Sequence, residues 1–124
     1  MAHLTELVAQ LNEHIGTGKI LEAMEAFYHE NAAMQENAKD PCVGLAANIE
    51  REKQFLAQVK DFHAFKAIAV GVQGGEGGTG TALIESFMEF TNQEDQKVRM
   101  EQVSVQKWEN GKVVHERFYY DSAG

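Results

Sequence analysis

The chain has 124 residues, a formal net charge of −8 and an apolar fraction of 44%, which fit one soluble domain over residues 1–124. An acidic chain without a basic cluster disfavours nucleic-acid binding, because a phosphate backbone would be repelled. No apolar run approaches the ~18 residues that cross a bilayer, so no membrane association is expected. The N-terminal residues lack a secretory signal pattern, and the single cysteine, Cys42, excludes an intramolecular disulfide. A cytoplasmic location is therefore expected.

Three helices are predicted in the first half of the chain. The first has one apolar stripe at helical spacing and is stopped by the Gly-Thr-Gly at 16–18; the stripe consists of Leu4, Leu7, Val8, Leu11 and Ile15. The second is predicted from about Lys19 to Tyr28. The third is predicted from about Leu45 to Val59, and its charged run at 50–53 is interpreted as a solvated face.

Strands follow in the second half, after one short strand predicted at 32–37. That short strand would place Ala32, Met34 and Glu36 on one face. Longer strands are predicted at 62–73 and 81–91. The glycine-rich stretch between them, 74–80, lacks the lysine and following helix of a phosphate-binding loop, so it is interpreted as a hairpin connection.

The last quarter of the chain is predicted to be a hairpin around Asn110-Gly111, the strongest short signal for a two-residue turn. Regular pairing from that turn would set Val105 opposite Glu116 and Val103 opposite Phe118. One face would then line a pocket: Glu101, Val103, Val105, Val114, Glu116, Phe118 and Tyr120. The other face would point outward: Met100, Gln102, Ser104, Gln106, Trp108, Val113, His115, Arg117, Tyr119 and Asp121.

Helices followed by strands indicate an α+β fold, with three N-terminal helices packed on a strongly curved, mostly antiparallel sheet. The order of elements, the segment FYHENA at 27–32 and the terminal WENGKVVHERFYYD at 108–121 resemble the SnoaL-like branch of the NTF2-like superfamily. The resemblance implies a cone-shaped fold that encloses a pocket, and homodimers through the convex sheet face. Its known members include ketosteroid isomerases, polyketide cyclases, dehydratases and epoxide hydrolases, together with non-catalytic modules.

The resemblance implies roles for only some residues. Glu36 matches the general base of the isomerases by its distance after FYHENA. The isomerases also use a tyrosine on the first helix, which this chain lacks, and an acid at the position that corresponds to Val105. The polyketide cyclases use an acidic residue in the terminal strands, and Glu116 is the nearest analogue.

Three carboxylates are therefore candidate catalytic residues: Glu36, Glu101 and Glu116. In an apolar pocket, desolvation would raise their pKa values toward the range useful for acid–base catalysis. The alternative is structural: Glu116 pairs with Lys107 or Lys66, and Glu101 accepts a hydrogen bond from a tyrosine. The candidate ligand-binding residues are Tyr28, Met34, Val103, Val105, Phe118 and Tyr120.

Two functions stay open on this reasoning. One is acid–base catalysis, of the isomerase, cyclase or dehydratase type, on a small apolar carbonyl or hydroxyl compound without a cofactor. The other is a non-catalytic ligand-binding or dimeric module. No metal site is expected, because His29, His63 and His115 do not form a close-spaced pair. A homodimer is expected through a convex face that carries Trp108, His115 and Tyr119.

Overall fold

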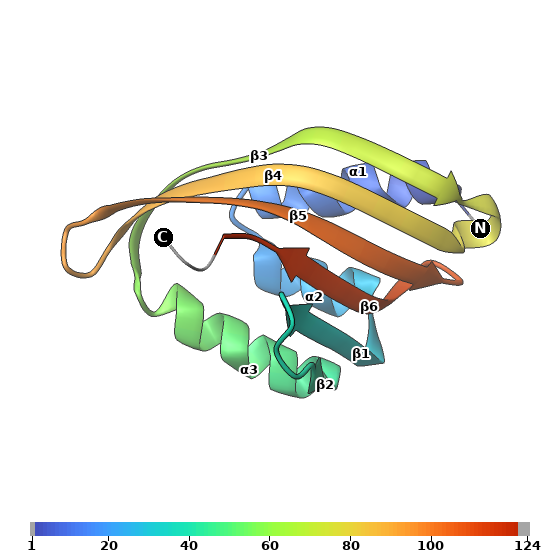
Figure 1. Cartoon of the computed structure of the whole chain (residues 1–124), viewed down its shortest axis with the longest axis horizontal. Helices are drawn as coiled ribbons and strands as arrows, with labels where there is room; N and C mark the ends of the chain where they lie inside the picture. The colour runs from blue at the N-terminus through green and yellow to red at the C-terminus, as the bar shows by residue number, and fades with distance from the viewer. Residues whose placement is uncertain (1, 122–124) are drawn as a thin grey trace.

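Three helices pack on the concave side of one six-stranded sheet in the computed structural model, which describes residues 2–121 (Figure 1). The α+β class and the three helices on a curved sheet are confirmed. The helices are α1 (Leu4–Gly16), α2 (Ile20–Phe27) and α3 (Leu45–Leu56), and a short 3₁₀ turn, η1 (Glu76–Gly78), joins two strands. The strands are β1 (Tyr28–Glu36), β2 (Cys42–Val43), β3 (Val59–Gly74), β4 (Gly80–Asn92), β5 (Lys97–Glu109) and β6 (Lys112–Tyr119).

Helix α1 buries the predicted stripe, since Leu4, Val8 and Leu11 are fully inaccessible to solvent. It ends at 16–18, where Gly18 adopts a positive φ of 81° that favours glycine. Helix α3 ends at Leu56, earlier than predicted. Val59 instead begins β3 and pairs with Asn92, so sheet pairing overrides the helical spacing there.

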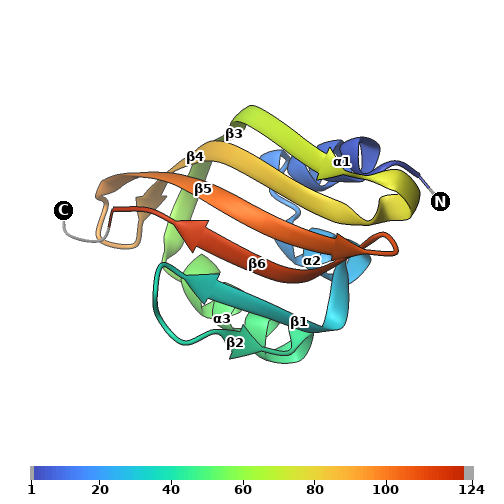
Figure 2. The ribbon, with the colours of Figure 1, turned by 45° about the vertical axis from the view of Figure 1, so that its right-hand side comes forward.

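The strand order is β2-β1-β6-β5-β4-β3, as Figure 2 shows. Strand β1 runs parallel to β6, and the other neighbours are antiparallel. The short β2 lies between the short strand predicted at 32–37 and the third predicted helix. Among the helices of residues 2–121, none combines the length and the apolar character that a membrane-spanning helix requires.

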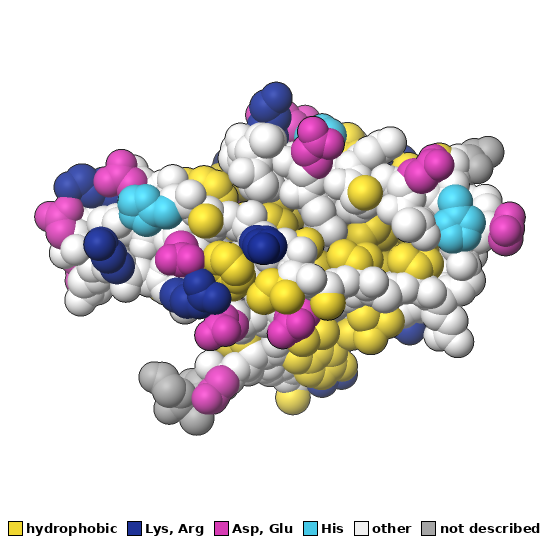
Figure 3. Space-filling view, turned by 90° about the horizontal axis from the view of Figure 1, so that it is seen from above, with side chains coloured by type: hydrophobic (Ala, Val, Ile, Leu, Met, Phe, Trp, Pro, Cys, Tyr) yellow, Lys and Arg dark blue, Asp and Glu magenta, His cyan; other side chains and the backbone are white. Residues whose placement is uncertain are grey.

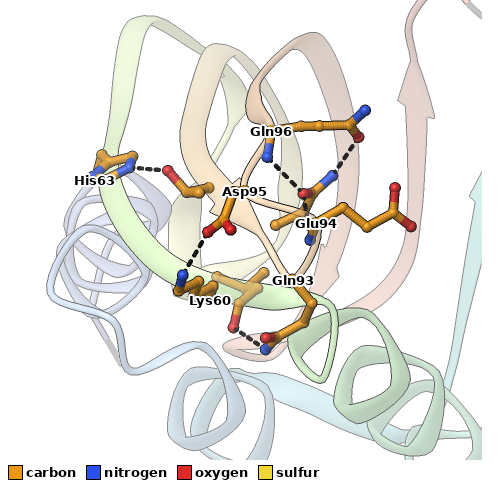
Figure 4. Close-up of polar contacts among 9 residues, drawn as sticks. Lys60, His63, Gln93, Glu94, Asp95 and Gln96 are labelled. Atoms are coloured by element: carbon orange, nitrogen blue, oxygen red, sulfur yellow. Dashed lines mark hydrogen bonds and ion pairs between the residues drawn. The ribbon is translucent and has the colours of Figure 1, made fainter.

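The far end of the β4–β5 hairpin is tied to the start of β3 by polar contacts (Figure 4). Lys60 Nζ lies 2.5 Å from Asp95 Oδ1, and His63 Nε2 lies 2.7 Å from Thr91 Oγ1. These side chains are exposed, and such surface pairs contribute little to stability. Thr91 is therefore a hydrogen-bond partner of His63.

The Asn110-Gly111 turn is present, with φ values of 50° and 82° at its two residues. Trp108 pairs with Val113, as predicted. The register then shifts, because Lys107 pairs with His115 and leaves Val114 as an extra residue, a β-bulge.

The bulge reverses the predicted faces of β5. Glu116 now lies opposite Gln106, and Phe118 lies opposite Ser104. A shift of one residue in the pairing changes which residues of the two strands share a face. Beyond the bulge, each β6 side chain therefore shares its face with β5 residues that were predicted to point the other way. The predicted pocket positions of Glu101, Val103 and Val105 are consequently wrong. The inward residues of β5 are those predicted to face outward: Met100, Gln102, Ser104, Gln106 and Trp108.

Trp108 shows the consequence most clearly, because only 1% of it is exposed. It packs edge-on against Phe27 of α2, with ring centroids 6.3 Å apart. The prediction that Trp108 lies on the convex face is therefore wrong. Tyr119 does lie on that face, with 43% of its surface exposed.

Helix α3 is anchored to the sheet edge by one buried polar side chain. Asn48 Nδ2 donates to the carbonyl oxygens of Ala32, Cys42 and Gly44, at 3.2, 3.0 and 2.9 Å. Buried polar groups need such partners, and here the two N–H groups of one amide are shared among three carbonyl oxygens. This anchor sets which face of α3 points into the cone.

Candidate functional site

A cavity of about 220 Å³ lies between the helices and the concave face of the sheet. Its walls include all four methionines that follow Met1, together with four aromatic side chains: Met24, Met34, Met88, Met100, Tyr28, Phe55, Phe65 and Phe118. Pockets for drug-sized ligands measure roughly 300–1,000 Å³, so this cavity suits a smaller molecule. Methionine side chains are flexible and polarisable, which allows such walls to adapt to a ligand.

Glu116 occupies this cavity at the centre of a chain of hydrogen bonds. The Tyr28 hydroxyl donates to Oε1 of Glu116, and Gln106 Nε2 donates to Oε2 at 2.8 Å. Trp108 Nε1 in turn donates to Gln106 Oε1 at 2.9 Å. No ion pair joins Glu116 to a cation within residues 2–121, so the alternative pairing with Lys107 or Lys66 is wrong.

The β-bulge and the parallel β1–β6 pairing bring this group together. The bulge sets Glu116 opposite Gln106, and Tyr28 enters from the start of β1, where it pairs with Val113. Only 3% of Glu116 is exposed, and burial raises the pKa of its carboxyl group. Hydrogen bonds from Tyr28, Gln106 and Ser104 act in the opposite direction without cancelling the effect of burial.

Tyr28 is a neutral hydrogen-bond donor. Burial, followed by the nearby charge of Glu116, raises the pKa of the Tyr28 hydroxyl well above its usual value of 10. Tyr28 thus supplies a proton-bearing hydroxyl that stabilises negative charge on Glu116.

Glu52 is a second carboxyl group in the same cavity, on α3. Burial, reinforced by the charge of Glu116, raises the pKa of Glu52 from 4.5 to about 7, while Arg51 opposes this shift. The sequence interpretation missed this residue, because the run at 50–53 was assigned to a solvated face. The helical period gave a signal: Glu52 lies three and four positions after Ile49 and Asn48, which both face inward.

Glu36 lines the cavity at the end of β1 but has a cationic partner. Arg51 Nη2 lies 3.2 Å from Glu36 Oε2, and both side chains are nearly half exposed. Tyr120 contacts the same carboxylate: burial, then the charge and hydrogen bond of Glu36, raises the pKa of Tyr120 above 10. Glu36, Arg51 and Tyr120 therefore form a polar group at the edge of the cavity. Glu36 and Arg51 line the cavity, whereas Tyr120, a predicted ligand-binding residue, does not.

The structure thus brings together some predicted site residues and separates others. Glu36, Glu116, Tyr28, Met34 and Phe118 line the cavity. Outside the cavity lie Glu101, Val103, Val105 and Tyr120. The side chain of Glu101 is 71% exposed, and its Oε1 lies 3.8 Å from Arg99 Nε. Val103 and Val105 lie on the same convex face of the sheet as Glu101. The catalytic and ligand-binding roles themselves remain predictions. No group of three or more His, Cys, Asp or Glu that could hold a metal ion occurs in the described part of the chain.

The fold and the site together define a cavity-bearing α+β domain with carboxyl groups inside an apolar cone. The sequence profile of the family described as SnoaL-like polyketide cyclase matches residues 5–124, and the chain belongs to this family. A comparison with curated proteins gives no match.

Solved structures share the fold at low sequence identity. An NTF2-like protein of unknown function from Burkholderia pseudomallei superposes with a TM-score of 0.79 at 14% identity, covering 99% of this chain and 94% of that one. A proposed isomerase from Bacillus subtilis superposes with a TM-score of 0.73 at 18% identity, covering 95% and 86%. An epoxide hydrolase of Mycobacterium tuberculosis gives 0.73 at 14%, covering 94% and 76%. At these identities the likeness establishes the fold.

Proposed function

We propose that this protein catalyses proton transfer on a small apolar carbonyl or hydroxyl compound, in a reaction of the isomerase or cyclase type. The observation that carries the proposal is the pair of carboxyl groups with raised pKa values, Glu52 and Glu116, in one small apolar cavity. Groups whose pKa values are shifted toward neutrality suit general acid–base catalysis. The family description and the isomerase and epoxide hydrolase among the structural neighbours agree with this class.

Glu116 is the general acid in this proposal. Burial raises the pKa of its carboxyl group and so favours the protonated form, whose proton passes to the oxygen of the bound carbonyl. The carboxylate that this transfer creates is stabilised by the donors already in place, the Tyr28 hydroxyl and the Gln106 amide. Such preorganised donors need no reorganisation during the reaction.

Glu52 is the general base. Its ionised carboxylate removes a proton from the carbon next to the carbonyl, and the C–H electron pair forms the carbon–carbon double bond of an enol. The carbonyl electron pair simultaneously takes the proton of Glu116. In a β,γ-unsaturated ketone the enol is a dienol, and return of the proton from Glu52 to its γ-carbon, with the enol proton passing back to Glu116, completes an isomerisation. Attack of the enol on a second carbonyl begins a cyclisation instead. The Glu36–Arg51 pair acts on this base through charge, because Arg51 lowers and Glu36 raises the pKa of Glu52.

The proposal predicts enzyme-catalysed exchange of the α-protons of cyclohexanone and hexan-2-one in deuterated water, followed by proton NMR. Glu52 accepts a proton only when ionised, so the rate should rise with pH through a midpoint between its ordinary pKa of 4.5 and about 7, because a protonated Glu116 adds no charge to the effect of burial. The Glu52→Gln variant should lose this rise and about 10²–10⁴-fold of the rate. The matched control is Glu50→Gln, an exposed carboxylate on the same helix, which should keep the wild-type profile.

Binding without catalysis is the second candidate function. It is favoured by one observation: both oxygens of Glu116 already accept hydrogen bonds, from Tyr28 and Gln106. Ketones that bind, as followed by the fluorescence of Trp108, while their α-protons exchange no faster than in buffer would decide for this candidate.

We also propose that the protein forms a homodimer through the convex face of the sheet. Figure 3 shows hydrophobic side chains gathered across the middle of this face between charged ones. Leu83, Val103 and Tyr119 are 44%, 38% and 43% exposed there, which is unusual for large apolar side chains on one surface. His115 shares the face, whereas buried Trp108 does not contribute.

Sedimentation velocity tests this association. Wild-type protein should sediment as a dimer, and Val103→Lys should sediment as a monomer, because a charge would be buried in the contact. Val43→Lys, at a 66% exposed position on β2, is the control that should stay dimeric. A monomeric wild type would contradict the proposal.

A further inference from the structure

A second, smaller cavity of about 80 Å³ adjoins the first. It lies between the loop after α1, the end of α3 and the start of β3. The two cavities share five lining residues: Ile15, Ile20, Glu52, Phe55 and Met88. A wall shared by so many residues places the second cavity directly beside the first.

The chemistry of the second cavity is almost entirely apolar. Its own lining adds the side chains of Leu56, Val59 and Phe62, and among the described residues that line it Glu52 is the one charged group. Phe55, on the shared wall, packs edge-on against Phe90 with ring centroids 5.4 Å apart. These walls favour a hydrocarbon group and disfavour a charged one, since a buried charge needs a partner.

We infer that the second cavity receives the apolar tail of the substrate, and that the substrate is therefore a carbonyl or hydroxyl compound with an unbranched hydrocarbon tail. This inference rests on the proposed function. Glu116 lines only the first cavity, whereas Glu52 lines both. A ligand with its oxygen at Glu116 and its tail in the second cavity presents the carbon between them to Glu52. That carbon is the one from which the proposed base removes a proton.

The ligand thus carries its oxygen, its α-carbon and its tail in the same order in which the protein presents Glu116, Glu52 and the second cavity. A compact ring alone would occupy only the first cavity, which at about 220 Å³ has room for a small polar head. A tail adds apolar area that is removed from water, and each buried methylene strengthens binding about fourfold.

The test is a series of methyl ketones from butan-2-one to octan-2-one, with binding followed by the fluorescence of Trp108. Trp108 is the single tryptophan of the chain, and its hydrogen bond to Gln106 connects it to Glu116. We expect the dissociation constant to fall about fourfold for each added methylene until the second cavity is filled.

The variant Val59→Phe should fill the second cavity and remove this dependence on chain length, while butan-2-one binds as in wild type. Val43→Phe makes the same change at a 66% exposed position outside both cavities and should bind like wild type. A second measurement needs no variant: NMR contacts from the terminal methyl group of octan-2-one to Leu56 and Val59 are expected in the wild-type protein.

The possible outcomes test the tail site separately from the proposed acid–base chemistry. Equal binding of all ketones, or terminal-methyl contacts confined to the first cavity, would overturn the inference and leave the acid–base proposal intact. Chain-length dependence and contacts to Val59 without any α-proton exchange would support the tail site and reject the proposed chemistry. No binding by any ketone of the series would overturn the inference.

Discussion

Replacing Glu116 with glutamine is expected to reduce α-proton exchange of a bound ketone by about 10²–10⁴-fold, the usual contribution of a general acid or base. The amide has nearly the shape of the carboxyl group but cannot transfer the proton. The hydrogen bonds tolerate the change: the new amide oxygen accepts from Gln106, and the Tyr28 hydroxyl rotates to accept from the new amide nitrogen. Activity should thus fall while the fold persists.

The measurement is the exchange rate by NMR, together with a urea unfolding curve for each protein. The control is Glu101→Gln, since that side chain is 71% exposed on the convex face and should keep the wild-type rate. A Glu116→Gln protein that exchanges ketone protons at the wild-type rate would remove Glu116 from the role of acid. The comparison also separates two carboxylates that sequence reasoning placed on the same face of the hairpin.

Replacing Trp108 with alanine is expected to lower the free energy of unfolding by about 3–5 kcal/mol, as for other large buried aromatic residues. Trp108 is 1% exposed, packs against Phe27 and donates to Gln106. Its removal leaves a cavity and an unpaired Gln106 oxygen beside the Glu116 network. We also expect weaker ketone binding, because Gln106 would lose the partner that orients it.

Urea unfolding measures this loss, with Tyr119→Ala as the matched aromatic control. Tyr119 is 43% exposed and stacks with Arg117, whose guanidinium lies 4.7 Å from the ring centroid. At constant protein concentration its replacement should change the free energy of unfolding far less than that of Trp108. A larger cost at Tyr119 than at Trp108 would show that the two aromatic residues lie on the opposite faces from those described.

Much of the fold could be predicted because its signals are local. The stripe of α1 and the Asn110-Gly111 turn each depend on residues that are close in the chain, and both predictions are confirmed. The α+β class follows from the order of such elements. Glu116 and Phe118 were placed in the cavity correctly, although opposite the wrong partners on β5.

The remainder of the site depends on contacts between distant segments. Strand β6 has an extra residue, Val114, in its pairing with β5. On its other side β6 pairs with β1, and that pairing is also irregular, between Tyr28 and Ala33. The register of β6 thus involves two strands that are distant from each other in the chain. The residues around the turn do not encode that register. The bulge between β5 and β6 decides that Gln106 lines the cavity and that Val103 and Val105 do not.

The sequence by itself determined the class of fold, the position of the hairpin turn and the apolar stripe of α1, because hydrophobic spacing and turn chemistry act over a few residues. Only the tertiary structure decided which carboxyl groups share the cavity. Glu52 acquires its raised pKa from burial and from the charge of Glu116, a residue 64 positions further along the chain (116 − 52). Desolvation and charge proximity are properties of the packed chain, so no local pattern around residue 52 could reveal that pKa.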